Sequence, residues 1–336
     1  MIDIFVYPVS AIMKLWHLLA ATFMDNSTAW IASIVLLVLT VRGFIAPLNW
    51  LSVKAARLGA LMRPENEALT ARLNDASTPE EAEGIIREQN ALRERFGYNP
   101  AAGCLPVFIM IPFFIGLYQV VLRMSRRTDL HRVGLLNEHD IDSFRAATIN
   151  DVSIVALARD HVELVTPILA AAIVFTILNS ILSMYRTFQT TRFEQTFARR
   201  MFWFTCLMVI LAPWILWNAA VNTIVPVAVI LYWGCTYLFT LIQTLVYNYI
   251  LHKRYPLTEE VHQMRHDAIR SWRRPRKERK AEKAARKAER LAIPREERQA
   301  HRKMIAEAHS AIRAERKAAK QQSAAPAPQD ADSEAS

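Results

Sequence analysis

Five long apolar blocks limit what this sequence can fold into. A helix of about 20 apolar residues spans the roughly 30 Å hydrocarbon core of a bilayer, and a water-soluble core needs no runs of that length. Because lipid requires every backbone polar group to be paired within the protein, we expect these blocks to be helices. The expected spans are 28–50, 101–122, 162–184, 200–218 and 225–250. The sequence thus predicts an all-α polytopic membrane protein with five transmembrane helices.

The first 27 residues are apolar but carry Pro8, Lys14 and His17. No basic segment precedes the apolar part and no small-residue cleavage site follows it, which argues against a signal peptide. We expect residues 1–27 to form a helix lying in the membrane interface. A sixth span is the alternative.

Basic residues are concentrated after the last span. Residues 252–336 hold 22 Lys/Arg and 13 Asp/Glu, whereas the rest of the chain holds 19 and 18. If this tail is cytoplasmic, the cytoplasmic segments together carry 33 Lys/Arg and the outer segments carry 7. Cytoplasmic loops of membrane proteins are enriched in Lys and Arg, so the predicted orientation has the N-terminus outside and the C-terminus inside.

The segments between the spans differ in character. Residues 51–100 are expected to form a cytoplasmic helical hairpin, because both halves carry apolar residues at helical spacing and Thr78–Pro79 is a helix-start signal between them. The tail has helix-forming stretches that look polar on all sides and an end that we expect to be disordered. The other segments are a polar extracytoplasmic loop at 123–161, a cytoplasmic loop at 185–199 and the basic tail at 251–336.

Common enzyme motifs are missing from the sequence, which contains no GxxxxGK[ST], HExxH or GxSxG. Cys104, Cys206 and Cys235 lie within expected spans and form no CxxC pair, so we expect neither disulfides nor a metal site from them. No Asp or Glu lies in the middle of a span, which weakens the case for an ion-coupled transporter. From these residues we expect no cofactor and no metal site.

Arg42 stands inside the first apolar block, in VLLVLTVRGFIAPLNW at 35–50. An arginine at the centre of a membrane helix costs about 2.5–3.5 kcal/mol on insertion scales, and less where its side chain reaches the headgroups. Arg42 lies about 18 Å along the helix from Trp30, and the chain stays apolar as far as Leu48. One interpretation is that Arg42 extends to the cytoplasmic headgroups. The other is that it faces a water-containing cavity within the bundle.

Polar residues on three spans could line such a cavity. They recur at helical spacing on one face of the third and fifth spans, and Asn49 follows Arg42 by two turns. Hydrogen bonding between neighbouring helices is the alternative role of such residues. The expected groove residues are Arg42, Asn49, Thr176, Asn179, Ser183, Tyr232, Trp233, Thr236 and Gln243.

Four short motifs, spread over roughly residues 1–250, resemble those of a known family. RGFIAP at 42–47 is similar to its R-x-x-x-x-P, and MRPENEAL at 62–69 to its Q-P-E-L. The most specific is NPAAGCLPVFIMIPFFIGLY at 99–118, close to NP-x-x-x-CLP-x-x-x-x-P-x-x-x-x-LY, and PVAVILYW at 226–233 resembles PAGLxLYW. These motifs are similar to those of the YidC/Oxa/Alb membrane protein insertases. The matching signature residues are Pro47, Asn99, Pro100, Cys104, Pro106 and Pro112.

The resemblance implies a non-enzymatic insertase and chaperone in the bacterial cytoplasmic (inner) membrane. It would insert client transmembrane proteins through a hydrophilic groove open to the cytoplasm and to lipid, with Arg42 attracting acidic client segments. The implied partners are nascent membrane proteins, the Sec translocon, a targeting receptor, and the ribosome through the basic tail. Anionic lipids are the alternative partner of the tail.

Two other classes of function remain open from the sequence. One is a small polytopic transporter or channel. The other is a membrane anchor that tethers ribosomes through its tail.

Overall fold

The computed structural model of the chain describes residues 3–99, 105–126, 132–222 and 224–324. The chain divides into two compact units. We call Met1–Ala60 with Asn99–Leu257 the membrane unit, and Leu61–Tyr98 with Thr258–Ser336 the hairpin–tail unit.

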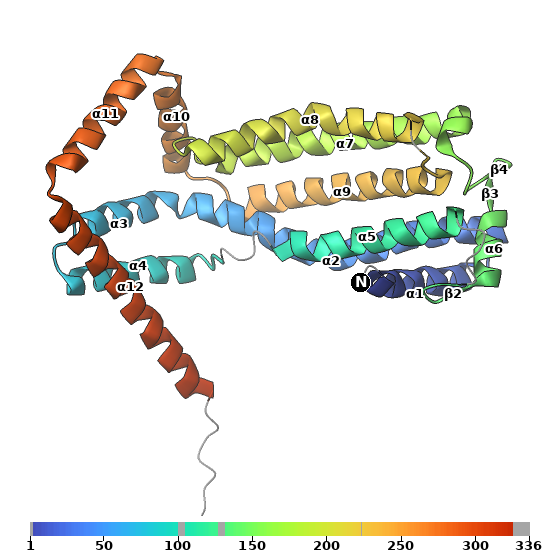
Figure 1. The fold of residues 1–336 in the computed structure, drawn as a ribbon, viewed down its shortest axis with the longest axis horizontal. Coiled ribbons are helices and arrows are strands. Elements are labelled where there is room, and N and C mark those ends of the chain that lie inside the picture. The colour runs from blue at the N-terminus through green and yellow to red at the C-terminus, as the bar shows by residue number, and fades with distance from the viewer. Residues whose placement is uncertain (1–2, 100–104, 127–131, 223, 325–336) are drawn as a thin grey trace, which may run out of the picture. The chain divides into compact units, whose positions relative to one another are not determined.

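Long helices lying side by side make up the described part of the membrane unit (Figure 1). Four of them, α2, α7, α8 and α9, are long and apolar enough to cross a membrane, which agrees with four of the expected spans. The helix α5 occupies the position of the remaining span, but many of its side chains lie outside the described part, so the count of five and the orientation stay predictions. The long helices are α1 (Asp3–Ala20), α2 (Asn26–Leu61), α5 (Leu105–Arg126), α7 (Val162–Thr190), α8 (Thr196–Asn222) and α9 (Val227–Arg254).

Capping and proline explain where two of these helices begin. Asp25 Oδ2 accepts a hydrogen bond from the backbone N–H of Thr28 at 3.1 Å, which caps α2 and lowers the pKa of Asp25. Pro226 directly precedes α9, where its fixed φ and missing N–H cost nothing to the helix. Pro47 lies inside α2, a position that membrane helices tolerate because neighbouring groups can satisfy the freed carbonyl.

The segment 132–161, which precedes α7, is folded, although its polar composition does not predict it. Its helix α6 starts with a capping box, in which the Asp140 N–H donates to Asn137 Oδ1 and the Asn137 N–H donates to Asp140 Oδ2. Ile141 and Phe144 of α6 are buried, so this segment contributes to the core of the unit. Its elements are β1 (Arg132–Val133), β2 (Leu136–Asn137), α6 (Glu138–Ala146), β3 (Thr148–Ile149), β4 (Val152–Ser153) and η2 (Ala158–Asp160), with β1 and β3 pairing antiparallel to β2 and β4.

The apolar core of the membrane unit lies at the end where α6 packs, which we call the loop end. Trp30 of α2 is fully buried there, with its ring stacked on His17 of α1 at 3.6 Å and edge-on to Phe144 at 5.3 Å. Its indole Nε1 donates to Ser143 Oγ at 2.9 Å, which satisfies the one polar group of the side chain. Other helices contribute Val120, Val121, Met124, Val165, Leu169, Val227 and Ile230 to this core.

The hairpin–tail unit contains two hairpin arms and three tail helices. Thr78 caps the second arm by accepting the Glu81 N–H at 3.2 Å, and Pro79 occupies its first turn, as the sequence predicts. The expected first arm is divided, because α2 continues to Leu61 and a break at Met62 precedes the next helix. The helices are α3 (Arg63–Asp75), α4 (Pro79–Arg95), α10 (Glu259–Arg273), α11 (Arg276–Ala292) and α12 (Arg295–Ala324).

The helix α12 is not polar on all sides, so that expectation is wrong. Apolar residues four positions apart lie on one face of a helix, and here they pack against the apolar stripes of α3 and α4. Two ion pairs flank this contact, Arg87–Glu315 at 3.0 Å and Arg316–Glu94 at 2.6 Å. The buried contact is formed by Met304, Ile305, Ala308 and Ile312 with Leu69, Leu73, Ala76, Ala82, Ile85 and Ile86.

Replacing Ile312 by Asp should release α12 from the hairpin. Ile312 is 4% exposed, and an unpaired carboxylate at such a site costs several kcal/mol unless it moves into water. We expect trypsin to cut within α12 at least about tenfold faster in Ile312→Asp than in the wild type, because the released helix frays. Ala314→Asp is the matched control, since it adds the same charge at an exposed position of the same helix. Equal cleavage of the two variants would contradict the docked arrangement.

Candidate functional site

Polar contacts replace the apolar core toward the other end of the membrane unit, which we call the Arg57 end. Tyr247 of α9 is central to them, because its hydroxyl donates to the Ala46 carbonyl of α2 at 2.5 Å and accepts from Gln243 Nε2 at 2.6 Å. The Tyr247 ring also lies 5.3 Å from that of Trp50. A tyrosine with a buried ring and a bonded hydroxyl can join two helices where no aliphatic core is present.

A second polar contact joins α7 to α9, which lie side by side (Figure 1). The hydroxyl of Thr244 donates to Asn179 Oδ1 at 2.6 Å. Nearer the loop end, Gly234 of α9 permits close approach, because a Cβ there would come within 3.3 Å of Ile168. Interhelical hydrogen bonds and small residues at contacts are typical of helix packing in membranes.

Arg57 joins the ends of three helices by hydrogen bonds, a role that the sequence pattern does not predict. Its Nε donates to the Tyr255 carbonyl and its Nη1 to Gln189 Oε1, both at 2.8 Å. The residue is 5% exposed. A guanidinium offers several donors in a fixed plane, so one side chain can bond groups from α7 and from the end of α9 at once.

Arg42 lies between the apolar core and these polar contacts. It is partly exposed, and among the residues that the structure describes it forms no ion pair and donates no hydrogen bond. It lies within electrostatic range of the Tyr237 hydroxyl of α9. Its neighbour Phe44 is 67% exposed, as expected for a side chain that faces lipid. The chain therefore keeps a positive charge in an apolar helix without a carboxylate from the described residues to balance it.

The remaining expected groove residues occupy different surroundings. Thr176 is buried and donates to the Ala172 carbonyl of its own helix at 2.7 Å, whereas the buried Thr236 hydroxyl has no partner within the described residues. Tyr232 and Trp233 pack against the apolar core. Asn49 and Ser183 are partly exposed.

The structure describes four of the six signature residues. Pro47 lies inside α2 and Pro112 inside α5, and Asn99 is exposed. Pro106 belongs to the first turn of α5. Pro100 and Cys104 lie outside the described residues.

The described residues contain no group of His, Cys, Asp or Glu side chains that could hold a metal ion.

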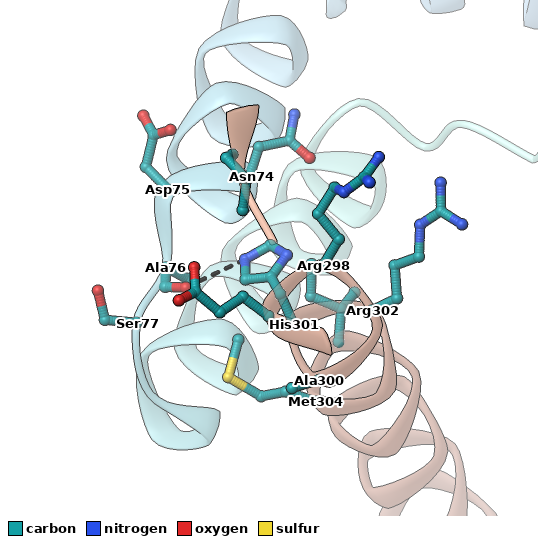
Figure 2. Close-up of a pocket in the computed structure, with 12 residues that line it drawn as sticks. Asn74, Asp75, Ala76, Ser77, Arg298, Ala300, His301, Arg302 and Met304 are labelled. Atoms are coloured by element: carbon teal, nitrogen blue, oxygen red, sulfur yellow. Dashed lines mark hydrogen bonds between the residues drawn. The ribbon is translucent and has the colours of Figure 1, made fainter. Parts of the chain in front are cut away.

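A cavity of about 840 Å³ lies in the hairpin–tail unit, between the α3–α4 turn and the start of α12 (Figure 2). His301 Nε2 donates to the Ala76 carbonyl at 3.2 Å across it. Arg298 and Arg302 point to one side of α12, but the acidic Asp75 and Glu297 also line the cavity. With its charges balanced, the cavity shows no preference for one ligand class.

Comparison with known proteins agrees with this architecture. Residues 22–254 match the family model described as "60Kd inner membrane protein". The membrane protein insertase YidC of Corynebacterium glutamicum is 35% identical over 282 residues, which are 77% of this chain and 67% of that protein. The YidC of Corynebacterium efficiens is 34% identical over 77% of this chain and 71% of its own length. The YidC of Mycobacterium tuberculosis strain H37Rv is 31% identical over 38% of this chain.

These matches confirm the resemblance that the sequence motifs indicated. Together with the four apolar helices, they assign the protein to the bacterial inner membrane as a multi-pass protein. The chain belongs to the 60Kd inner membrane protein family, the family of the YidC/Oxa/Alb insertases.

Proposed function

We propose that this protein is a membrane protein insertase and chaperone, which helps client transmembrane helices to enter the bilayer without enzymatic catalysis. Relatives named as membrane protein insertases support this proposal. The observation that carries it is the uneven interior of the membrane unit. An apolar core fills the loop end, while Arg42 and the interhelical hydrogen bonds lie beyond it toward the Arg57 end.

The free energy for insertion comes from the client itself. Each strongly apolar residue gains about 0.3–0.6 kcal/mol at the centre of the membrane, so a helix of about 20 residues gains enough to insert spontaneously. The obstacle is the polar segment at the end of the client, which has to cross hydrocarbon. A hydrophilic groove that is closed at the loop end and open at the Arg57 end would shorten that crossing.

Arg42 supplies a charge that a client can use. Because the described residues give it no carboxylate partner, its pairing with an acidic client segment breaks no existing ion pair. Such a contact would lower the energy of an acidic segment on its way through the groove, most strongly where little water screens it. The client helix would then leave along α7 and α9, past Asn179 and Gln243, into lipid.

The orientation in this mechanism has the N-terminus outside and the hairpin and tail in the cytoplasm. The N-terminal helix α1 would lie in the interface, where its Lys14 holds Asp140 at 2.8 Å. The hairpin would receive clients or contact a targeting receptor or the Sec translocon. The exposed basic faces of the tail would bind the ribosome or anionic lipids.

Arg42→Ala should slow the insertion of acidic clients and spare neutral ones. Loss of a partly screened charge contact of about 1 kcal/mol corresponds to a roughly fivefold slower rate. Arg42→Lys should keep much of the activity, because a water-containing groove uses the charge more than the fork of the guanidinium. The measurement is insertion of a single-span client into proteoliposomes, with its N-terminal segment carrying either two Asp or two Asn residues.

Equal insertion of both clients by all three proteins would refute the role of the Arg42 charge. Insertion no faster than in protein-free liposomes would refute the insertase itself. A solute flux through the wild-type proteoliposomes, without client insertion, would instead favour a transporter or channel.

Removing residues 258–336 should weaken ribosome binding and leave the dependence on Arg42 intact. Lys and Arg that neutralise phosphates release counterions, so binding of the full chain should fall steeply as salt rises from 50 to 200 mM. Ribosome co-sedimentation with detergent-purified full-length and shortened protein measures this. If the shortened protein also lost the difference between acidic and neutral clients, a ribosome-tethering anchor would describe the protein better.

A further inference from the structure

Arg186 of α7 is a second arginine of the membrane unit that the proposed mechanism has not used. It is partly exposed, and within the described part of the chain it forms no ion pair and its side chain makes no hydrogen bond. Arg57, by contrast, donates hydrogen bonds to Gln189 and to Tyr255. Among the described residues, Arg57 therefore joins helices, whereas Arg186 does not, although both lie toward the same end of the membrane unit.

Helical spacing defines the direction in which Arg186 faces. Seven residues make almost two turns of a helix, so Arg186 lies nearly in line with Asn179, which bonds Thr244 of α9. On the other side, Gln189 bonds Arg57 of α2. Arg186 thus lies on the strip of α7 between its contacts with α9 and with α2. The same placement brings it within electrostatic range of the Tyr247 hydroxyl.

Arg42 and Arg186 lie at different positions along the long axes of the helices. Arg42 is within electrostatic range of Tyr237, and Arg186 is within electrostatic range of Tyr247, which lies ten residues or about 15 Å further along α9. The Tyr247 hydroxyl reaches back to Ala46, only four residues or about 6 Å beyond Arg42. The charges are therefore roughly 6 to 15 Å apart along the helices. An extended chain covers that distance in about two to five residues.

We propose that Arg186 is a second client-attracting group, which an acidic segment entering from the Arg57 end meets before it reaches Arg42. This inference rests on the proposed insertase function. Because the two arginines lie at different depths along the helices, a client carboxylate can pair first with Arg186 and then with Arg42. The acidic segment would therefore move in two short steps. Clients with two acidic residues about three positions apart can contact both arginines at once and should depend on both.

The test uses the full-length protein in proteoliposomes and three clients that differ only in the N-terminal segment. One carries two Asp residues three positions apart, one carries a single Asp, and one carries Asn at both positions. The protein variants are Arg42→Ala, Arg186→Ala, Arg186→Lys and the double alanine variant. Arg200→Ala is the matched control, because Arg200 is an exposed arginine of the same unit.

Arg186→Ala should insert the two-Asp client about fivefold more slowly than the wild type, and the neutral client at the wild-type rate. Arg186→Lys should recover most of the loss, which a purely structural role of the guanidinium would not allow. The double alanine variant should be slower on the two-Asp client than either single variant, and Arg200→Ala should match the wild type on every client.

Two outcomes would overturn the role of Arg186 and leave the proposed insertase function in place. Arg186→Ala could insert the two-Asp client as fast as the wild type while Arg42→Ala slows it, or it could slow all three clients equally, as loss of a lipid headgroup contact or of packing would. Failure of the wild type to insert any client above protein-free liposomes would instead overturn the proposed function. The neutral client reports whether each variant is folded.

Discussion

The packing around Trp30 is the contact on which the arrangement of the membrane unit depends. It brings α1, α2 and α6 together at the loop end, where His17 stacks on the indole, Phe144 meets it edge-on and Ser143 accepts its N–H. Large aromatic side chains bury the most apolar surface for each residue, so this end is held by nonpolar contact. Toward the Arg57 end, the helices are joined by hydrogen bonds instead. The two ends of the membrane unit therefore differ in polarity, and this difference defines a direction along the helices.

The direction matters because a charge is useful to an insertase only where water and lipid can both approach it. In a close-packed apolar core Arg42 would be too costly, and at the headgroups it would be paired with phosphate. Beyond the core, Arg42 lies within electrostatic range of Tyr237 and has no carboxylate partner among the described residues. The same reasoning applies to Arg186, whose helix α7 is joined to α9 by the hydrogen bond of Asn179 and to α2 by that of Gln189.

The sequence predicts the helices well and their contacts poorly. Apolar length identifies α2, α7, α8 and α9, because a span is a local property of about 20 residues. The folded loop escapes prediction, since its short strands and α6 become ordered only by burying Ile141 and Phe144 against distant helices. The docking of α12 is missed for a similar reason. Its stripe of Met304, Ala308 and Ile312 is short, and the surrounding charged residues conceal it.

The central claim is that the space around Arg42 is open to water from one side only. Accessibility of single cysteines tests it directly, in a background from which Cys104, Cys206 and Cys235 have been removed. A membrane-impermeant maleimide added on the side of the tail should label Ser183→Cys and Asn49→Cys, which replace partly exposed residues, and should not label Leu37→Cys, which replaces a fully buried residue of the core. From the other side it should label none of the three. Absence of labelling at Ser183→Cys and Asn49→Cys, or labelling of either from both sides, would contradict a one-sided hydrophilic groove.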